Sequence, residues 1–129
     1  MHIAAQTCIA IEGEQPREVY FLLTGCILKE SSLERKIGMK NTYLIEGSIF
    51  GETDVMKNRP RVESYTAVTD CYMLKLSKAI FGELLEEFDD FNQEVSTIAK
   101  ERELIRMAQI KAYKSGEGFK LLDDYEVLG

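Results

Sequence analysis

The side chains with the clearest chemical potential lie in one segment, residues 48–68, where Arg61 follows Gly51 and Glu52 after a gap of eight residues. A glycine can adopt a left-handed backbone, which lets another group approach the chain closely. The carboxylate of Glu52 can accept hydrogen bonds from sugar hydroxyls, and the guanidinium of Arg61 offers paired donors to a phosphate. The first N–H groups of a short helix after the glycine would also favour an anion. These residues predict a minimal site for a ribose and a phosphate.

Two further acids in this segment leave alternatives open. Glu52 and Arg61 could form an ion pair that only stabilises the fold. Asp54 would repel a phosphate that it faced at close range, or it could cap the N-terminus of a short helix. Glu63 adds another negative charge two positions after Arg61. The segment therefore indicates either a ligand site or a structural charge cluster.

Short apolar runs separated by turn residues fill the first part of the chain and predict β-strands. The runs cover residues 7–11, 19–23, 26–29, 41–45, 64–68 and 71–76. Residues 31–40 are ambiguous, and Leu33 and Ile37 predict a weak strand there. Many short strands at such intervals are typical of a sandwich, a jelly roll or a closed barrel.

The pattern changes to helical spacing at Ser77, which is a suitable helix N-cap. Apolar residues recur at helical intervals over 79–88, and again over 91–113 after the pair Asp89–Asp90. Gly116 and Gly118 predict the end of the longer helix. These two helices would pack against the strands.

Length and composition exclude several classes of protein. The chain has 129 residues and a net charge of −6, which fits one domain and argues against a nucleic-acid-binding surface. No stretch approaches the roughly 20 apolar residues of a membrane span, so we expect a cytoplasmic fragment without membrane contact.

Cysteine and histidine usage gives no metal site and no catalytic pair. Cys8, Cys26 and Cys71 are widely spaced, and we expect three buried, reduced thiols. The lone His2 could not complete a zinc site. No nucleophile lies beside a base, so we expect neither an enzyme nor a cofactor.

The segment just described resembles the phosphate-binding cassette of the cyclic nucleotide-binding domain family. The matching residues are Phe50, Gly51, Glu52, Pro60, Arg61, Ser64 and Ala67. Upstream, residues 12–14 (EGE) and 19–25 (VYFLLTG) resemble the family's first hairpin. The resemblance implies a mainly β fold, an eight-stranded jelly-roll-like β-barrel (a double-stranded β-helix), followed by C-terminal lid helices.

The resemblance also implies roles for individual residues. Glu52 would bind the ribose 2′-hydroxyl and Arg61 the cyclic phosphate. Val62 stands where members that prefer cGMP often carry Thr, which favours cAMP over cGMP. The rest of the implied site comprises Phe50 and Gly51 with the phosphate loop at Thr53 and Asp54, and the lid candidates Leu104, Ile105 and Met107.

The expected organisation is a single domain over residues 1–129, with a barrel at about 3–76, helices at about 77–114 and a tail at 115–129. The implied function is a cyclic-nucleotide sensor that passes lid-helix movement to an effector region, either a channel pore or a kinase, as a monomer or weak oligomer. The alternative is a degenerate domain that binds no nucleotide and serves as an interaction or autoregulatory module. In that case residues 125–128 could fill the pocket.

Overall fold

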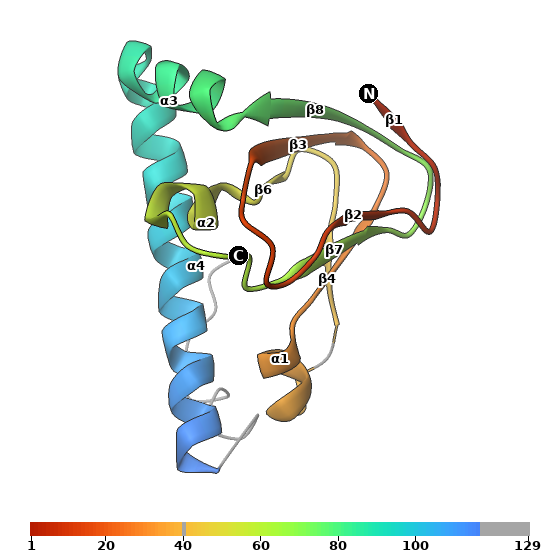
Figure 1. Cartoon of the computed structure of the whole chain (residues 1–129), viewed down its shortest axis with the longest axis vertical. Coiled ribbons are helices and arrows are strands. Elements are labelled where there is room, and N and C mark those ends of the chain that lie inside the picture. Colours follow the sequence, from red (N-terminus) through yellow and green to blue (C-terminus); the bar gives the residue numbers. More distant parts are fainter. Residues whose placement is uncertain (40, 117–129) are drawn as a thin grey trace.

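The computed structural model describes residues 1–39 and 41–116, which fold into an antiparallel β-sandwich with helices along one side (Figure 1). One sheet has the order β1-β8-β3-β6 and the other β2-β7-β4-β5. The strands are β1 (His2–Ile3), β2 (Cys8–Ala10), β3 (Glu18–Thr24), β4 (Ile27–Glu30), β5 (Thr42–Leu44), β6 (Ile49–Phe50), β7 (Ser64–Ala67) and β8 (Cys71–Ser77). The helices are α1 (Ser32–Lys36), α2 (Glu52–Lys57), α3 (Lys78–Glu87) and α4 (Asp89–Ser115). The predicted jelly-roll-like fold with C-terminal helices is confirmed.

The core between the two sheets fixes the strand that leads into the candidate site. Phe50, at the end of β6, is fully buried between Tyr20 and Tyr65, with ring centroids 5.0 and 4.9 Å away. Aromatic rings at such spacing add to the stabilisation that burial provides. Because Phe50 is held in this way, the next residues leave the sheet at a defined point. Phe50 is therefore a core residue that positions the start of α2.

A second cluster attaches the helices to the outside of the β1-β8-β3-β6 sheet. Val19, Ile49, Val55, Phe81 and Val95 bury their side chains together, and they come from β3, β6, α2, α3 and α4. The side chain of Ser77 accepts a hydrogen bond from the Ile80 N–H, as the cap prediction requires. Gly116 ends α4 with φ +74°, which confirms the predicted stop. Figure 1 shows α4 standing along one side of the sandwich, with α2 beside it.

The weak strand predicted around Leu33 and Ile37 is wrong, because residues 32–36 form α1. The Ser31 hydroxyl accepts a hydrogen bond from the Glu34 N–H at 3.0 Å and caps this helix. The four-residue spacing of Leu33 and Ile37 is a helical interval, and the residues between them favour helices. Local capping and propensity therefore determine this segment.

The cysteines differ in their exposure to solvent. The three cysteines carry free thiols, but Cys8 is exposed and Cys26 half-buried, so the expectation of three buried thiols is wrong. No helix within the described ranges is long and apolar enough to cross a bilayer. The expected role of residues 125–128 lies outside the described residues.

We predict that Phe81→Ala lowers the free energy of unfolding by about 3–5 kcal/mol, because it empties the centre of the second cluster. Phe81 is 1% exposed, whereas Phe88, which follows the same helix, is 55% exposed. Phe88→Ala is therefore a matched control and should change stability by about 0.5 kcal/mol or less. Urea unfolding followed by circular dichroism measures both. Equal losses in the two variants would contradict the assigned core.

Candidate functional site

Gly51 begins the site by turning the chain from β6 into α2. It has φ +82° and ψ 0° and serves as the N-cap of α2 without a side-chain hydrogen bond. A Cβ atom at this position would lie 2.7 Å from Nη1 of Arg61. Glycine is therefore required both for the left-handed backbone and for the approach of the guanidinium. The alternative in which Asp54 caps this helix is wrong, because Asp54 lies within its first turn.

Arg61 is buried beneath this turn, with 4% exposure. Its Nη1 donates to the Gly51 carbonyl at 2.7 Å, and its Nη2 donates to the Glu18 carbonyl at 2.6 Å. Arg61 and Tyr20 both line a cavity of about 360 Å³. Glu52 lines a second, smaller cavity, and Arg61 does not line that one. The guanidinium thus holds the backbone of β3 to the start of α2.

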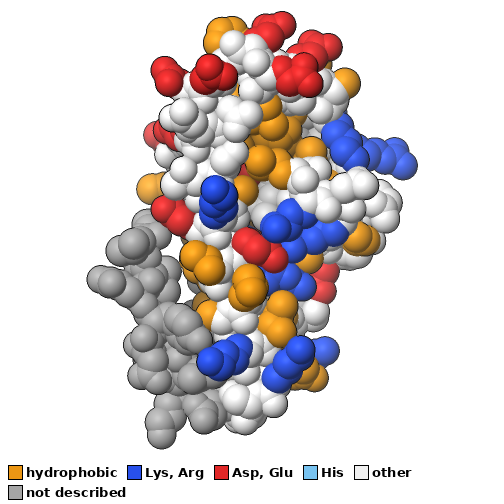
Figure 2. Space-filling model, turned by 90° about the vertical axis from the view of Figure 1, so that its left-hand side faces the viewer, with side chains coloured by type: hydrophobic (Ala, Val, Ile, Leu, Met, Phe, Trp, Pro, Cys, Tyr) orange, Lys and Arg blue, Asp and Glu red, His pale blue; other side chains and the backbone are white. Residues whose placement is uncertain are grey.

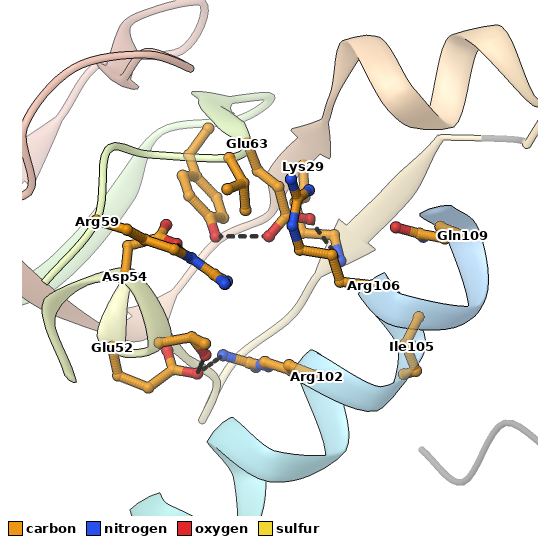
Figure 3. Close-up of a pocket in the computed structure, with 13 residues that line it drawn as sticks. Lys29, Glu52, Asp54, Arg59, Glu63, Arg102, Ile105, Arg106 and Gln109 are labelled. Carbon is orange, nitrogen blue, oxygen red and sulfur yellow. Dashed lines mark hydrogen bonds and ion pairs between the residues drawn. The ribbon is translucent and has the colours of Figure 1, made fainter. Parts of the chain in front are cut away.

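Glu52 is the most buried charged residue of the site, with 0% exposure. Its Oε1 accepts hydrogen bonds from Arg102 Nη1 at 2.7 Å and from the Thr53 hydroxyl at 3.0 Å. Its Oε2 is buried and has no hydrogen-bond partner among the described residues. Figure 3 shows Arg102 reaching from α4 to this carboxylate. The alternative of a Glu52–Arg61 ion pair is therefore wrong, since the partner is Arg102.

A second arginine links α2 to α4. Arg59 Nε donates to Asp54 Oδ1 at 2.9 Å, while its Nη1 and Nη2 donate to the two carboxylate oxygens of Glu103 at 2.9 and 2.8 Å. The hydrogen bonds from Arg59 lower the pKa of Glu103 below its ordinary value. We call Arg102–Glu52 and Arg59–Glu103 the two arginine bridges. They join consecutive residues of α4 to α2 and to the loop after it.

The opposite wall of the cavity carries a second charge cluster. Lys29 Nζ lies 3.0 Å from Glu63 Oε2, and the Tyr65 hydroxyl donates to Glu63 Oε1 at 3.3 Å. The negative charge of Glu63 is therefore paired on this wall. Glu34 lies nearby and accepts a hydrogen bond from Gln109 Nε2 at 3.3 Å. Burial raises the pKa of Glu34.

The cavity enclosed by these walls has a volume of about 40 Å³. That space has room for only a few water molecules, whereas pockets for small-molecule ligands span roughly 300–1,000 Å³. Arg102 and Arg106 extend from α4 across this space, and Arg106 approaches Glu63 and Lys29 (Figure 3). A ligand of that size can enter only if α4 or its side chains move away from α2.

The structure brings part of the predicted site together. The cavity is lined by Gly51, Glu52, Thr53, Asp54, Val62 and Ile105. Phe50 lies in the core, Arg61 lines the other cavity, and Leu104 and Met107 point to solvent with 66% and 58% exposure.

The polar residues that α4 contributes to the cavity were not among the predicted site residues. Arg102, Ile105, Arg106 and Gln109 line the cavity at intervals of three, one and three residues, which place them on one helix face. That spacing is visible in the sequence and could have identified this face. Arg59 gave no comparable signal, because its partner Glu103 is 44 residues away.

We predict that Glu103→Gln lowers the free energy of unfolding by about 1–2 kcal/mol at neutral pH, because it weakens a bidentate charge-assisted contact. The pKa of Glu103 is lowered from its ordinary value of 4.5 by Arg59. The stabilisation is therefore complete above about pH 4.5 and is lost as the pH falls through the folded-state pKa.

Urea unfolding of both proteins between pH 3 and 7 tests this, with exposed Glu101→Gln on the same helix as the matched control. The difference between wild type and Glu103→Gln should shrink toward pH 3. A difference that stays constant with pH would contradict the ion pair.

Comparison with known proteins places this geometry in a family. The family model for the cyclic nucleotide-binding domain matches residues 1–88. Potassium/sodium hyperpolarization-activated cyclic nucleotide-gated channel 3 from Homo sapiens is 36% identical over 98 residues, which are 76% of this chain and 12% of the channel. The chain thus spans about an eighth of that channel's length.

Two solved structures share the fold. The structure of cAMP-bound PfPKA-R (141-441) has a TM-score of 0.62 and a sequence identity of 23%. The match covers 78% of this chain and 34% of the PfPKA-R chain. The regulatory subunit of a cAMP-independent protein kinase A from Trypanosoma brucei has a TM-score of 0.62 at 21% identity, with coverage of 75% and 34%. At these identities the likeness concerns the fold alone. With the match over residues 1–88, the chain belongs to the cyclic nucleotide-binding domain family.

Proposed function

We propose that this domain is a ligand-sensing regulatory module in which α4 is the moving lid and a cyclic nucleotide, cAMP rather than cGMP, is the ligand. The carrying observation is the carboxylate of Glu52. One oxygen is held by Arg102 of α4, and the other is buried without a partner in the described part of the chain. A buried acceptor without a donor is costly, so a ligand hydroxyl that donates to it would bind favourably.

The position of Glu52 connects ligand binding to movement of α4. The cavity of about 40 Å³ must enlarge before a nucleotide enters, and the two arginine bridges hold α4 against α2. The ligand enters while these bridges are open, and α4 then closes over it, because binding that is tighter to the closed state shifts the helix toward that state. Movement of α4 then becomes the signal to an effector region.

The other predicted contacts complete the proposal. The ribose would bind Glu52, and the phosphate would lie at the first turn of α2 near Gly51 and Thr53. Arg61 would contribute its charge from beneath that turn, with Val62 and Ile105 packing against the rest of the ligand. The similarity to a cyclic nucleotide-gated channel favours a channel pore as the effector, and the fold of the kinase regulatory subunits makes a kinase the other choice.

A nucleotide-independent module is the second candidate, and Asp54 favours it. Asp54 is 3% exposed in the first turn of α2, where its carboxylate pairs with Arg59. A phosphate in that turn would meet this negative charge at close range. Arg61 is meanwhile committed to two backbone carbonyls. One solved structure of the same fold belongs to a kinase named as cAMP-independent. In that case the two arginine bridges would hold α4 permanently against α2, and the domain would act as an interaction module.

Isothermal titration with cAMP and then cGMP distinguishes the two candidates. We predict binding of cAMP, with affinity reduced at least about tenfold in Glu52→Gln, because the hydroxyl loses a charged acceptor. Arg61→Ala should weaken binding by a similar factor. Asp54→Ser should strengthen it, since the change removes the competing carboxylate.

Glu101→Gln, on the exposed face of α4, is the control and should bind as wild type does. Absence of heat at millimolar nucleotide in both wild type and Asp54→Ser would overturn the sensor proposal and support the nucleotide-independent module. Binding that is unchanged in Glu52→Gln would instead contradict the assigned site.

A further inference from the structure

The short helix α1 contacts the later turns of α4, and these contacts are separate from the two arginine bridges. Glu34 of α1 accepts a hydrogen bond from Gln109 Nε2 at 3.3 Å, and Lys36 Nζ lies 5.5 Å from the centroid of the Tyr113 ring. We call these two contacts the α1 clasp. Figure 1 shows α1 and α2 beside different parts of α4, with α1 nearer its C-terminal end. Figure 2 shows basic side chains toward this end of the molecule and acidic ones at the other.

The Glu34–Gln109 contact joins two buried polar side chains. Glu34 is 4% exposed and Gln109 is 5% exposed. Lys29 Nζ lies 4.0 Å from Glu34 Oε1, which is beyond hydrogen-bond distance. A buried carboxylate without a donor is costly, and Gln109 of α4 supplies a donor. The closed position of α4 therefore satisfies a polar group that the sandwich side has buried.

The helix α1 is itself anchored to the sandwich. The N–H of Ser32 donates to Glu12 Oε1 at 2.8 Å, and its hydroxyl donates to Glu12 Oε2 at 2.5 Å. The N–H of Glu12 in turn donates to the Ser64 hydroxyl of β7 at 2.9 Å. Ile37, at the end of α1, is 5% exposed. These contacts fix α1, so that α4 is the part of the clasp that can move away.

The face of α4 that lines the small cavity continues to the clasp. Arg102, Arg106 and Gln109 line the cavity, and Tyr113 follows Gln109 at a helical interval of four residues. From Arg102 to Tyr113 the helix axis advances by about 16 Å, at roughly 1.5 Å per residue. The helix is thus held at two places, by the arginine bridges at 102–103 and by the clasp at 109–113. Loss of the bridges alone leaves its later turns in place.

From this arrangement we propose that the α1 clasp regulates access to the small cavity by setting how often α4 opens. The proposal rests on the proposed function in treating α4 as the lid. All contacts of the clasp come from the chain itself, so they hold α4 closed before a ligand arrives. Entry then requires loss of the clasp as well as of the bridges, and the open fraction of the domain falls as the clasp strengthens.

Hydrogen exchange of backbone amides, measured by mass spectrometry on the full chain without nucleotide, tests the exposed contact first. We expect Lys36→Ala to speed exchange in residues 107–115 about twofold to fivefold, because the last turns of a released helix fray. Arg35→Ala is the matched control, since it removes the same charge from α1 but Arg35 pairs with Glu30. It should exchange as wild type does. Unchanged exchange in Lys36→Ala, or equal changes in both variants, would overturn the proposal.

The buried contact is tested by Gln109→Leu, which keeps a good helix former and removes the donor to Glu34. We expect exchange in residues 107–115 to rise at least about fivefold, since the buried carboxylate loses its hydrogen bond. Gln93→Leu makes the same change at an exposed position of α4 and should have no effect there. Exchange that rises equally along the whole chain, or not at all, would contradict a local clasp. Because no nucleotide is present, this failure is distinct from a failure of nucleotide binding, which the cAMP titration decides.

Discussion

The carboxylate of Glu52 is the constraint on which the site depends. With 0% exposure it cannot be solvated by water, and a buried charge requires a partner of opposite sign. Arg102 provides that partner from α4, 50 residues further along the chain. The position of α4 is therefore tied to the residue at the start of α2. Any group that competes for Glu52 acts on the helix as well as on the cavity.

Glycine at position 51 allows Glu52 to reach that position. Its left-handed backbone turns β6 into α2 and leaves room for Arg61 beneath the turn. Arg61 then donates to carbonyls of β3 and of Gly51 itself, which fixes the turn to the sheet. The three arginines therefore make different contacts. Arg61 supports the turn from below, while Arg59 and Arg102 connect α2 and its loop to α4.

Local patterns in the sequence were sufficient for much of the fold and part of the site. Turn residues and apolar runs predicted six of the eight strands, whereas β1 and β6, with two residues each, are too short to give a recognisable run. Ser77 and Gly116 marked helix ends, and the Gly51–Glu52 pair located the cavity. The orientation of the Arg61 side chain was not predictable, because it is set by hydrogen bonds to the backbone carbonyls of Glu18 in β3 and of Gly51. Arg102 and Arg59 were missed for a related reason, since their partners are 50 and 44 residues away in the chain. Sequence periodicity identifies a helix face, but tertiary packing selects what that face contacts.

The central claim is that the Glu52–Arg102 pair couples the cavity to α4, and a double-mutant cycle tests it most directly. Urea unfolding of wild type, Glu52→Gln, Arg102→Gln and the double variant at pH 7 gives the coupling free energy between the two side chains. Contact through a charge-assisted hydrogen bond predicts a favourable coupling of at least about 1 kcal/mol. A coupling below about 0.5 kcal/mol, the range of independent sites, would contradict the account.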